Sequence, residues 1–209
     1  MQMKRWIAGL MLAAALGLGM PTVMARAVAV PETVYQWVQS SPRMNYYFNK
    51  QQICFAVDAA GFIDLNTLIV PTVRTYDDIK IQDVLDKRRW RMESTDGFDD
   101  LAGEADYLQF NLALQTVDVT QVDFLDSGLA TLASSSPEQV IQVAKLPPKS
   151  LDSVFYHAVL DYAKQHQDEI IAHTKGQLKA ADQQRLVAEK KAAEKAARDQ
   201  AKNDKTHHQ

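Results

Sequence analysis

The sequence predicts an α+β protein in which a mainly antiparallel sheet is packed by short helices and is followed by a long C-terminal helix. Apolar and polar residues alternate over several short segments in the first two thirds of the chain, most clearly over residues 107–124. Such alternation is typical of strands with one buried face. From Ser150 to about Lys202, by contrast, the residues favour a helix that only Gly176 interrupts.

The first 27 residues predict export. Lys4 and Arg5 precede an uncharged, largely apolar run over residues 6–20, and residues 25–27 (Ala-Arg-Ala) have the small residues that a signal peptidase recognises. Because this run is short for a bilayer span, we expect cleavage rather than anchoring, with no transmembrane segment in the remaining chain. The single cysteine, Cys54, excludes an internal disulfide. Export without disulfides suits a periplasmic or extracellular place in a bacterial envelope.

Composition divides the chain into four predicted segments. They are a signal peptide (1–27), an α+β domain (28–148), an amphipathic helix packed on that domain (149–176), and a charged tail rich in Ala, Lys and Glu that is helical or disordered (177–209). The two prolines at positions 147 and 148 mark the boundary before the amphipathic helix.

Charge is distributed unevenly between the body and the tail. Residues 28–174 contain 11 Lys and Arg against 21 Asp and Glu, whereas residues 175–209 contain 9 against 5. The body therefore carries a net charge of −10 and the tail +4. Nucleic-acid binding needs clustered positive charge, so the acidic body argues against a nucleic-acid partner.

The N-terminal part of the domain is predicted to form one helix and two strands. Residues 31–40 are typical of a short helix, because Pro31 suits the first helical position. Residues 52–58 and 62–66 alternate like two strands, and Gly61 between them supplies the positive φ that a tight hairpin needs.

Three further segments complete the predicted sheet. Residues 68–76 form a strand in which Pro71 marks an edge or a bulge. Residues 107–124 continue the sheet past a turn or bulge at Gln115-Thr116, and residues 140–143 form a short strand.

Helices are predicted at two places. Residues 77–90 form a helix capped by one of two leading aspartates, although residues 79–82 also alternate like a strand. Ser150 caps the C-terminal helix, and Asp152 in its first turn complements the helix dipole. Up to Gly176 the apolar residues form one stripe that should pack on the domain, and beyond it large apolar residues are rare.

The candidate binding residues are Arg88, Arg89, Trp90 and Arg91, which with Lys87 form the one basic cluster of the acidic body. Cations beside an indole suit an anionic glycan, a phosphate or an acidic partner. The alternative is that these charges neutralise nearby carboxylates while Trp90 fills the core. The aromatic run at residues 46–48 either lines a ligand cleft or divides between core and surface.

Other reactive side chains lack the surroundings of a site. His166, Glu169 and His173 share one helix face with a spacing that suits a metal ion, but no second ligand cluster accompanies them. Cys54 has no flanking motif. The acidic residues near Asp96 do not fit a calcium-binding EF-hand loop, because the third position from Asp96 is Phe98. We expect no metal, no cofactor and no catalytic residue.

Export, the absence of catalytic motifs and a tail opposite in charge to the body favour a non-enzymatic envelope protein. Such a protein would bind an envelope surface or a protein partner through its body. Two alternatives stay open. One is an exported hydrolase whose catalytic residues lie far apart in the sequence, and the other is a helical, chaperone-like structural protein.

Overall fold

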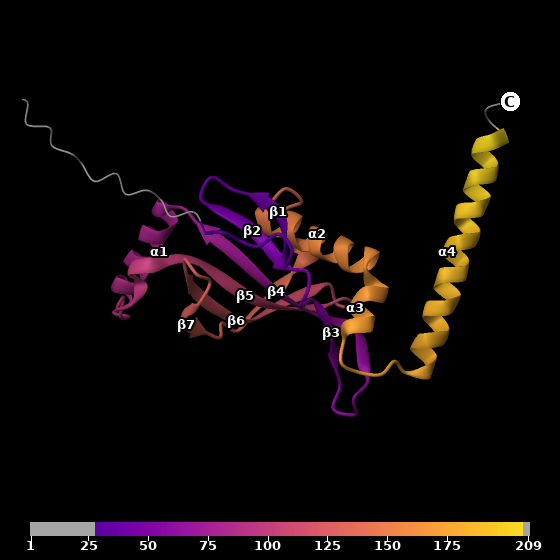
Figure 1. The fold of residues 1–209 in the computed structure, drawn as a ribbon, viewed down its shortest axis with the longest axis horizontal. Coiled ribbons are helices and arrows are strands. Elements are labelled where there is room, and N and C mark those ends of the chain that lie inside the picture. Colours follow the sequence, from indigo (N-terminus) through magenta and orange to yellow (C-terminus); the bar gives the residue numbers. More distant parts are fainter. Residues whose placement is uncertain (1–27, 207–209) are drawn as a thin grey trace, which may run out of the picture.

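The computed structural model describes residues 28–206. The predicted signal peptide lies outside the described residues. The described chain forms an antiparallel sheet of eight strands, with helices packed against it (Figure 1). The prediction of an α+β protein with a mainly antiparallel sheet is therefore confirmed.

Three long strands form the centre of the sheet. They are β4 (Ile63–Tyr76), β5 (Leu101–Asn111) and β6 (Thr116–Asp126), which lie side by side in that order. The predicted strands at 62–66 and 68–76 are thus one continuous strand. Residues 107–124 divide between β5 and β6, joined by a turn in which Gln115 has a φ of 52°.

Four short strands pair with the outer edges of these long ones, and a fifth pairs with one of the four. Along β4, β3 (Cys54–Val57) pairs near its start and β2 (Met44–Asn49) near its end, with β1 (Tyr35–Ser40) outside β2. Along β6, β8 (Gln139–Gln142) pairs near its start and β7 (Thr131–Ser135) near its end. Gly61, with a φ of 84°, lies in the loop between β3 and β4 as predicted.

Pro71 lies inside β4 without breaking it. β3 pairs with β4 as far as Ile69, and β2 pairs with it from Thr72, so Pro71 falls between the two partners. A proline offers no N–H to a ladder, and this gap is where a central strand tolerates that lack. Beside it, the Thr72 hydroxyl donates to the carbonyl of Asp106 at 3.0 Å and accepts from its N–H at 3.3 Å. The proline marks a change of partner and not the edge of the sheet.

The predicted helix over residues 31–40 is wrong. Pro31 does begin one helical turn, in which its carbonyl accepts from the N–H groups of Val34 at 3.0 Å and Tyr35 at 2.9 Å. The chain then continues as β1 and pairs with β2. Half of the residues over 31–40 are aromatic or β-branched, and pairing with a neighbouring strand outweighs the weak helical spacing.

The helix predicted over residues 77–90 is confirmed as α1 (Asp78–Trp90). The side chain of Asp77 caps it by accepting from the Lys80 N–H at 2.7 Å. Farther along the chain, α2 (Leu151–Gln165) begins after Ser150, whose hydroxyl accepts from the Ser153 N–H at 3.2 Å. Two 3₁₀ turns, η1 (Phe98–Asp100) and η2 (Val143–Lys145), complete this part of the fold.

The single long C-terminal helix is not supported. α2 is followed by a separate helix, α3 (Gln167–His173), then by the non-helical residues 174–179, and then by α4 (Ala180–Thr206). The Thr174 hydroxyl donates to the Ile170 carbonyl at 2.7 Å and accepts from the Phe55 N–H at 3.2 Å. Contacts with β3 therefore end the helix despite its favourable composition.

The tail contacts the acidic body. Leu186 on α4 is buried against the main core. Two lysines form ion pairs with carboxylates of the preceding chain, Lys190 with Asp168 at 2.7 Å and Lys179 with Asp58 at 3.1 Å. Beyond these contacts α4 extends away from the sheet (Figure 1). Part of the positive charge of the tail is therefore used within the molecule.

Two apolar clusters share one face of the sheet. The larger lies under α2, where Phe155 and Tyr156 pack on Tyr46 and Phe110 with ring centres 5.9 and 5.7 Å apart. The smaller lies under α1 at the other end of β4, around Val84, Phe98 and Leu101. The face is therefore covered from both ends.

Among the described residues, no helix is long and apolar enough to cross a membrane.

Gly103 gives a direct test of the close approach of β4 and β5. A Cβ at this position would lie 2.3 Å from the backbone oxygen of Arg74. We expect Gly103→Ala to lower the free energy of unfolding by about 1–3 kcal/mol, because the two strands would have to separate. Urea denaturation measures this. The control, Gly128→Ala in an exposed loop, should change stability by less than about 0.5 kcal/mol, and equal effects of both changes would contradict the assignment.

Candidate interaction surface at the end of helix α1

The four residues predicted to bind a partner lie together at the C-terminal end of α1, but they have different surroundings. Arg88 is turned towards the protein, with its side chain only 17% exposed. Its guanidinium donates to the Ser94 carbonyl from Nε at 3.0 Å and from Nη2 at 2.8 Å. It also pairs with Glu93 at 3.1 Å and lies 4.2 Å from the centre of the Phe98 ring. These contacts hold the C-terminal end of α1 against the protein. They leave the Arg88 guanidinium unavailable to a partner.

The other two arginines are exposed. Arg89 pairs with Asp86 one turn earlier at 2.9 Å, an arrangement of small energetic value on a surface. Arg91 caps the helix, and its side chain has no ion pair or hydrogen bond to any described residue. Positive charge in the last turn of a helix stabilises the helix dipole. The basic cluster thus has a structural role at the end of α1.

Trp90 and Met92 are the most exposed large apolar side chains of the described chain, at 90% and 96%. Trp90 does not fill the core, which was the alternative interpretation of the sequence. Met92 follows α1 directly and was not recognised from the sequence. Two large apolar side chains this exposed, two positions apart in the sequence, make the end of α1 the candidate contact surface.

The backbone at Met92 has the conformation that ends α1. The Glu93 N–H donates to the Arg88 carbonyl at 2.9 Å, and the Met92 N–H donates to the Arg89 carbonyl at 3.0 Å. These two bonds form a Schellman motif, which requires a left-handed residue at Met92, and its φ is 58°. Glycine is the usual residue there, because a side chain is strained at positive φ. Met92 is therefore an exposed residue in a backbone conformation that usually selects glycine.

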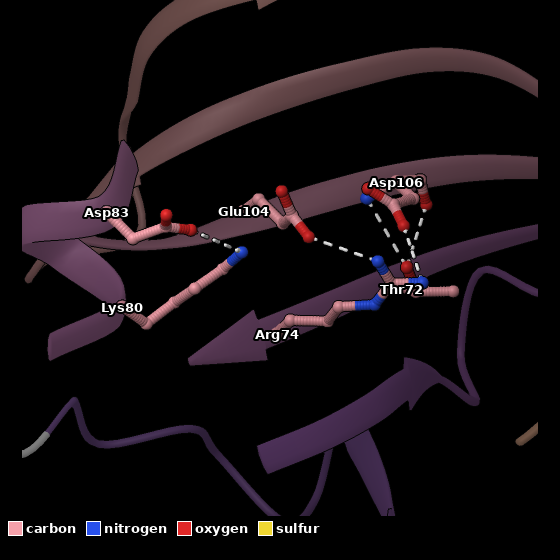
Figure 2. A network of polar contacts seen from close by, with 6 residues as sticks. All are labelled: Thr72, Arg74, Lys80, Asp83, Glu104 and Asp106. Carbon is pink, nitrogen blue, oxygen red and sulfur yellow. Dashed lines mark hydrogen bonds and ion pairs between the residues drawn. The ribbon is translucent and has the colours of Figure 1, made fainter. Parts of the chain in front are cut away.

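A second group of charged residues lies on β4 and β5 (Figure 2). Along β4 its arginine falls between Val70 of the larger apolar cluster and Tyr76 of the smaller one. Arg74 on β4 pairs with two carboxylates of β5, Glu104 at 3.1 Å and Asp106 at 3.0 Å. The Arg74 guanidinium also lies 5.3 Å from the ring centre of Tyr46. This network is not predicted from the sequence. The one indication of it in the sequence is that charged residues occur within segments that otherwise alternate between apolar and polar residues.

The network is too deeply buried to act on a substrate. The side chain of Asp106 is 4% exposed, and those of Arg74 and Glu104 are largely covered. Burial raises the pKa of Asp106 to about 6, although Arg74 acts in the opposite direction. Burial also raises the pKa of Tyr76, and the nearby Glu104 carboxylate raises it further. The buried Tyr76 hydroxyl has no hydrogen-bond partner among the described residues. The network joins β4 to β5 and defines their register.

Two shallow cavities lie along α2, on either side of η2. Their volumes are about 560 and 310 Å³, and His157 and Asp161 line both. His157 Nδ1 lies 2.7 Å from the Ser153 carbonyl, so the ring donates to the backbone of its own helix. No hydrogen bond joins His157 to a carboxylate among the described residues. The pair does not form the histidine–aspartate arrangement of a hydrolase.

The remaining reactive side chains are not assembled into a site. His166 contacts Glu169 at 3.0 Å and stacks on Tyr162, whereas His173 bonds to the Ile53 carbonyl on another element. Within the described part of the chain, no three His, Cys, Asp or Glu side chains lie close enough to hold a metal ion. Burial raises the pKa of the Cys54 thiol, which lowers its nucleophilicity at neutral pH.

Replacing Asp106 with asparagine should change the pH dependence of stability. The folded protein holds the Asp106 proton up to about pH 6, above the ordinary value of 3.8, so this group stabilises the fold at low pH. That contribution is lost as the pH rises through about 6. Relative to the wild type, we expect Asp106→Asn to gain about 2–3 kcal/mol between pH 4 and pH 7.5. Urea denaturation across this range measures the difference, and parallel pH profiles would contradict the assignment.

Replacing Met92 with glycine tests the strain at the end of α1. Glycine adopts the left-handed conformation without penalty, so we expect Met92→Gly to raise the free energy of unfolding by about 1 kcal/mol. Chemical denaturation of the two proteins measures it. A loss of stability would mean that the Met92 side chain contributes packing that outweighs its strain.

No family model, curated protein or solved structure matches this chain. The function is therefore inferred from the geometry at the end of α1.

Proposed function

We propose that this is an exported, non-enzymatic envelope protein that binds a protein partner through the end of α1. The contact surface consists of Trp90 and Met92, with Arg89 and Arg91 beside them. The observation that carries the proposal is the exposure of Trp90 and Met92, with Met92 in a strained conformation that glycine would relieve. Stability given up at an exposed position is typical of a residue retained for function.

The composition of this surface favours a protein over a lipid or a nucleic acid. Tryptophan and arginine are the residues that most often anchor protein–protein interfaces, and methionine is enriched there. The cations are interspersed with carboxylates, since Asp86 and Glu93 pair with Arg89 and Arg88. An anionic membrane or a phosphate backbone would instead select a surface of one charge.

The rigid setting of the surface also favours specific binding. Arg88 fastens the last turn of α1 to Ser94 and Phe98, and Val84 anchors the helix in the smaller apolar cluster. Trp90 therefore projects from an element that is already ordered. A partner does not have to supply the free energy of ordering it.

Co-sedimentation with purified envelopes tests this function. We expect the exported protein to pellet with untreated envelopes, and Trp90→Ala to weaken this about 30-fold, the effect of losing an anchor worth about 2 kcal/mol. Binding should disappear when the envelopes are first digested with protease. The matched control is Leu114→Ala, which removes another apolar side chain that is 68% exposed and should bind like the wild type.

Two results would contradict the proposal. Equal binding by the wild type and Trp90→Ala would remove the end of α1 from the contact. Undiminished binding to digested envelopes, or to vesicles of extracted lipid alone, would mean that the target is not a protein.

A further inference from the structure

We propose that a pocket at the β1 edge of the sheet, on the face opposite α2, binds a saccharide. The pocket has a volume of about 440 Å³ and is lined by the following residues: Val30, Glu32, Tyr35, Gln36, Trp37, Tyr47 and Lys50. It is separate from the end of α1 in sequence and in its elements. The proposal does not depend on the function proposed for that surface.

Strand register places three aromatic rings on this face. Phe48 on β2 is buried in the core under α2, so its neighbour Tyr47 faces the other way. Trp37 pairs with Tyr47, and Tyr35 lies two residues before Trp37 on the same side of β1. The aromatic run at residues 46–48 thus divides between the two faces, with Tyr47 alone turned to the pocket.

Trp37 is held so that its ring stays available. Its indole N–H donates to the Ser40 hydroxyl at 3.3 Å, while the side chain as a whole is 54% exposed. An aromatic ring with a fixed edge and an open face offers a flat apolar surface. The C–H groups on one face of a sugar ring fit against such a surface.

The polar groups around the rings complete a site for hydroxyl groups. Glu32 is close enough to Tyr47 to raise the pKa of that phenol, together with burial, which is the larger cause. Lys50 lines the same pocket, so one carboxylate and one ammonium offset each other. A pocket without net charge, with both donors and acceptors beside aromatic rings, suits a neutral polyhydroxylated ligand better than an anion.

The aromatic face continues along the sheet beyond the pocket. Tyr107 on β5 lies on this side, and the Asp123 carboxylate and Tyr35 both raise its pKa, after burial. Asp123 is itself held by the Gln121 amide at 2.8 Å. Tyr35, which lines the pocket, and Tyr107 are therefore near one another on the same face of the sheet.

The test observes the indole N–H signals by NMR in the full chain as the expression host exports it. Of the three tryptophans, Trp6 belongs to the predicted signal peptide. Trp37→Phe and Trp90→Phe assign the signals of the other two, and Trp90 serves as an internal control outside the pocket. The probes are three tetrasaccharides, of β-1,4-linked N-acetylglucosamine, β-1,4-linked glucose and α-1,4-linked glucose. We expect at least one to shift the Trp37 signal at millimolar concentration and to leave the Trp90 signal in place. Tyr47→Ala should weaken this binding about tenfold, equivalent to about 1.4 kcal/mol.

Two results would contradict the binding of a saccharide in this pocket. No shift of the Trp37 signal with any probe at 10 mM (an order-of-magnitude limit for weak sites, about −3 kcal/mol) would overturn the proposal. Equal shifts of Trp37 and Trp90 would show non-specific association and would also overturn it. Tyr47→Ala is judged only if its other amide signals match those of the wild type. If it fails to fold, Glu32→Gln replaces it, with the same expected loss.

Discussion

The register of β4 against β5 is the constraint on which the rest of the structure depends. β4 pairs with β5 from Thr67 to Thr75 without a shift, so its alternate side chains face α2, the charged network and α1 in turn. Leu68 and Val70 enter the core under α2, and Tyr76 enters the cluster under α1. A slip of one residue would turn all of them to the other face. Arg74, held by Glu104 and Asp106, makes that slip costly, because it would leave three charges buried without partners.

This constraint also explains how α1 can carry an exposed end. β4 leads directly into Asp77, which caps α1, so the position of the helix follows from the position of the strand. Arg88 then holds the last turn of α1 in place by packing on the Phe98 ring. In this short stretch of chain, Arg88 holds the helix in place. Trp90 and Met92, close by in the sequence, are not covered by any part of the described fold. The separation of these roles is what makes the surface a candidate for binding.

The sequence predicted those parts of the fold that depend on local patterns. The caps at Asp77 and Ser150 and the strands around Gly61 were correct, because each follows from the residue's own chemistry. The helix expected over 31–40 was wrong, since its residues pair with a strand that is not visible from local spacing. The C-terminal helix was wrong at Thr174 for the same reason, because a bond to Phe55 ends it.

The candidate surface was predicted only in outline. The four basic and aromatic residues do lie together at the end of α1, but their sequence did not show that Arg88 turns inwards or that Trp90 stays in water. Met92 was missed because positive φ at a non-glycine residue has no local signature. The buried network was missed because its members come from two strands, and only their pairing brings opposite charges together.

Site-specific photocrosslinking at position 90, in cells that export the protein, tests binding through the end of α1 most directly. A photoreactive phenylalanine derivative replaces Trp90 in one variant and Leu114 in the control. We expect one discrete adduct with an envelope protein from position 90 and none from position 114. No adduct at position 90, or the same adducts from both positions, would contradict a specific protein contact there.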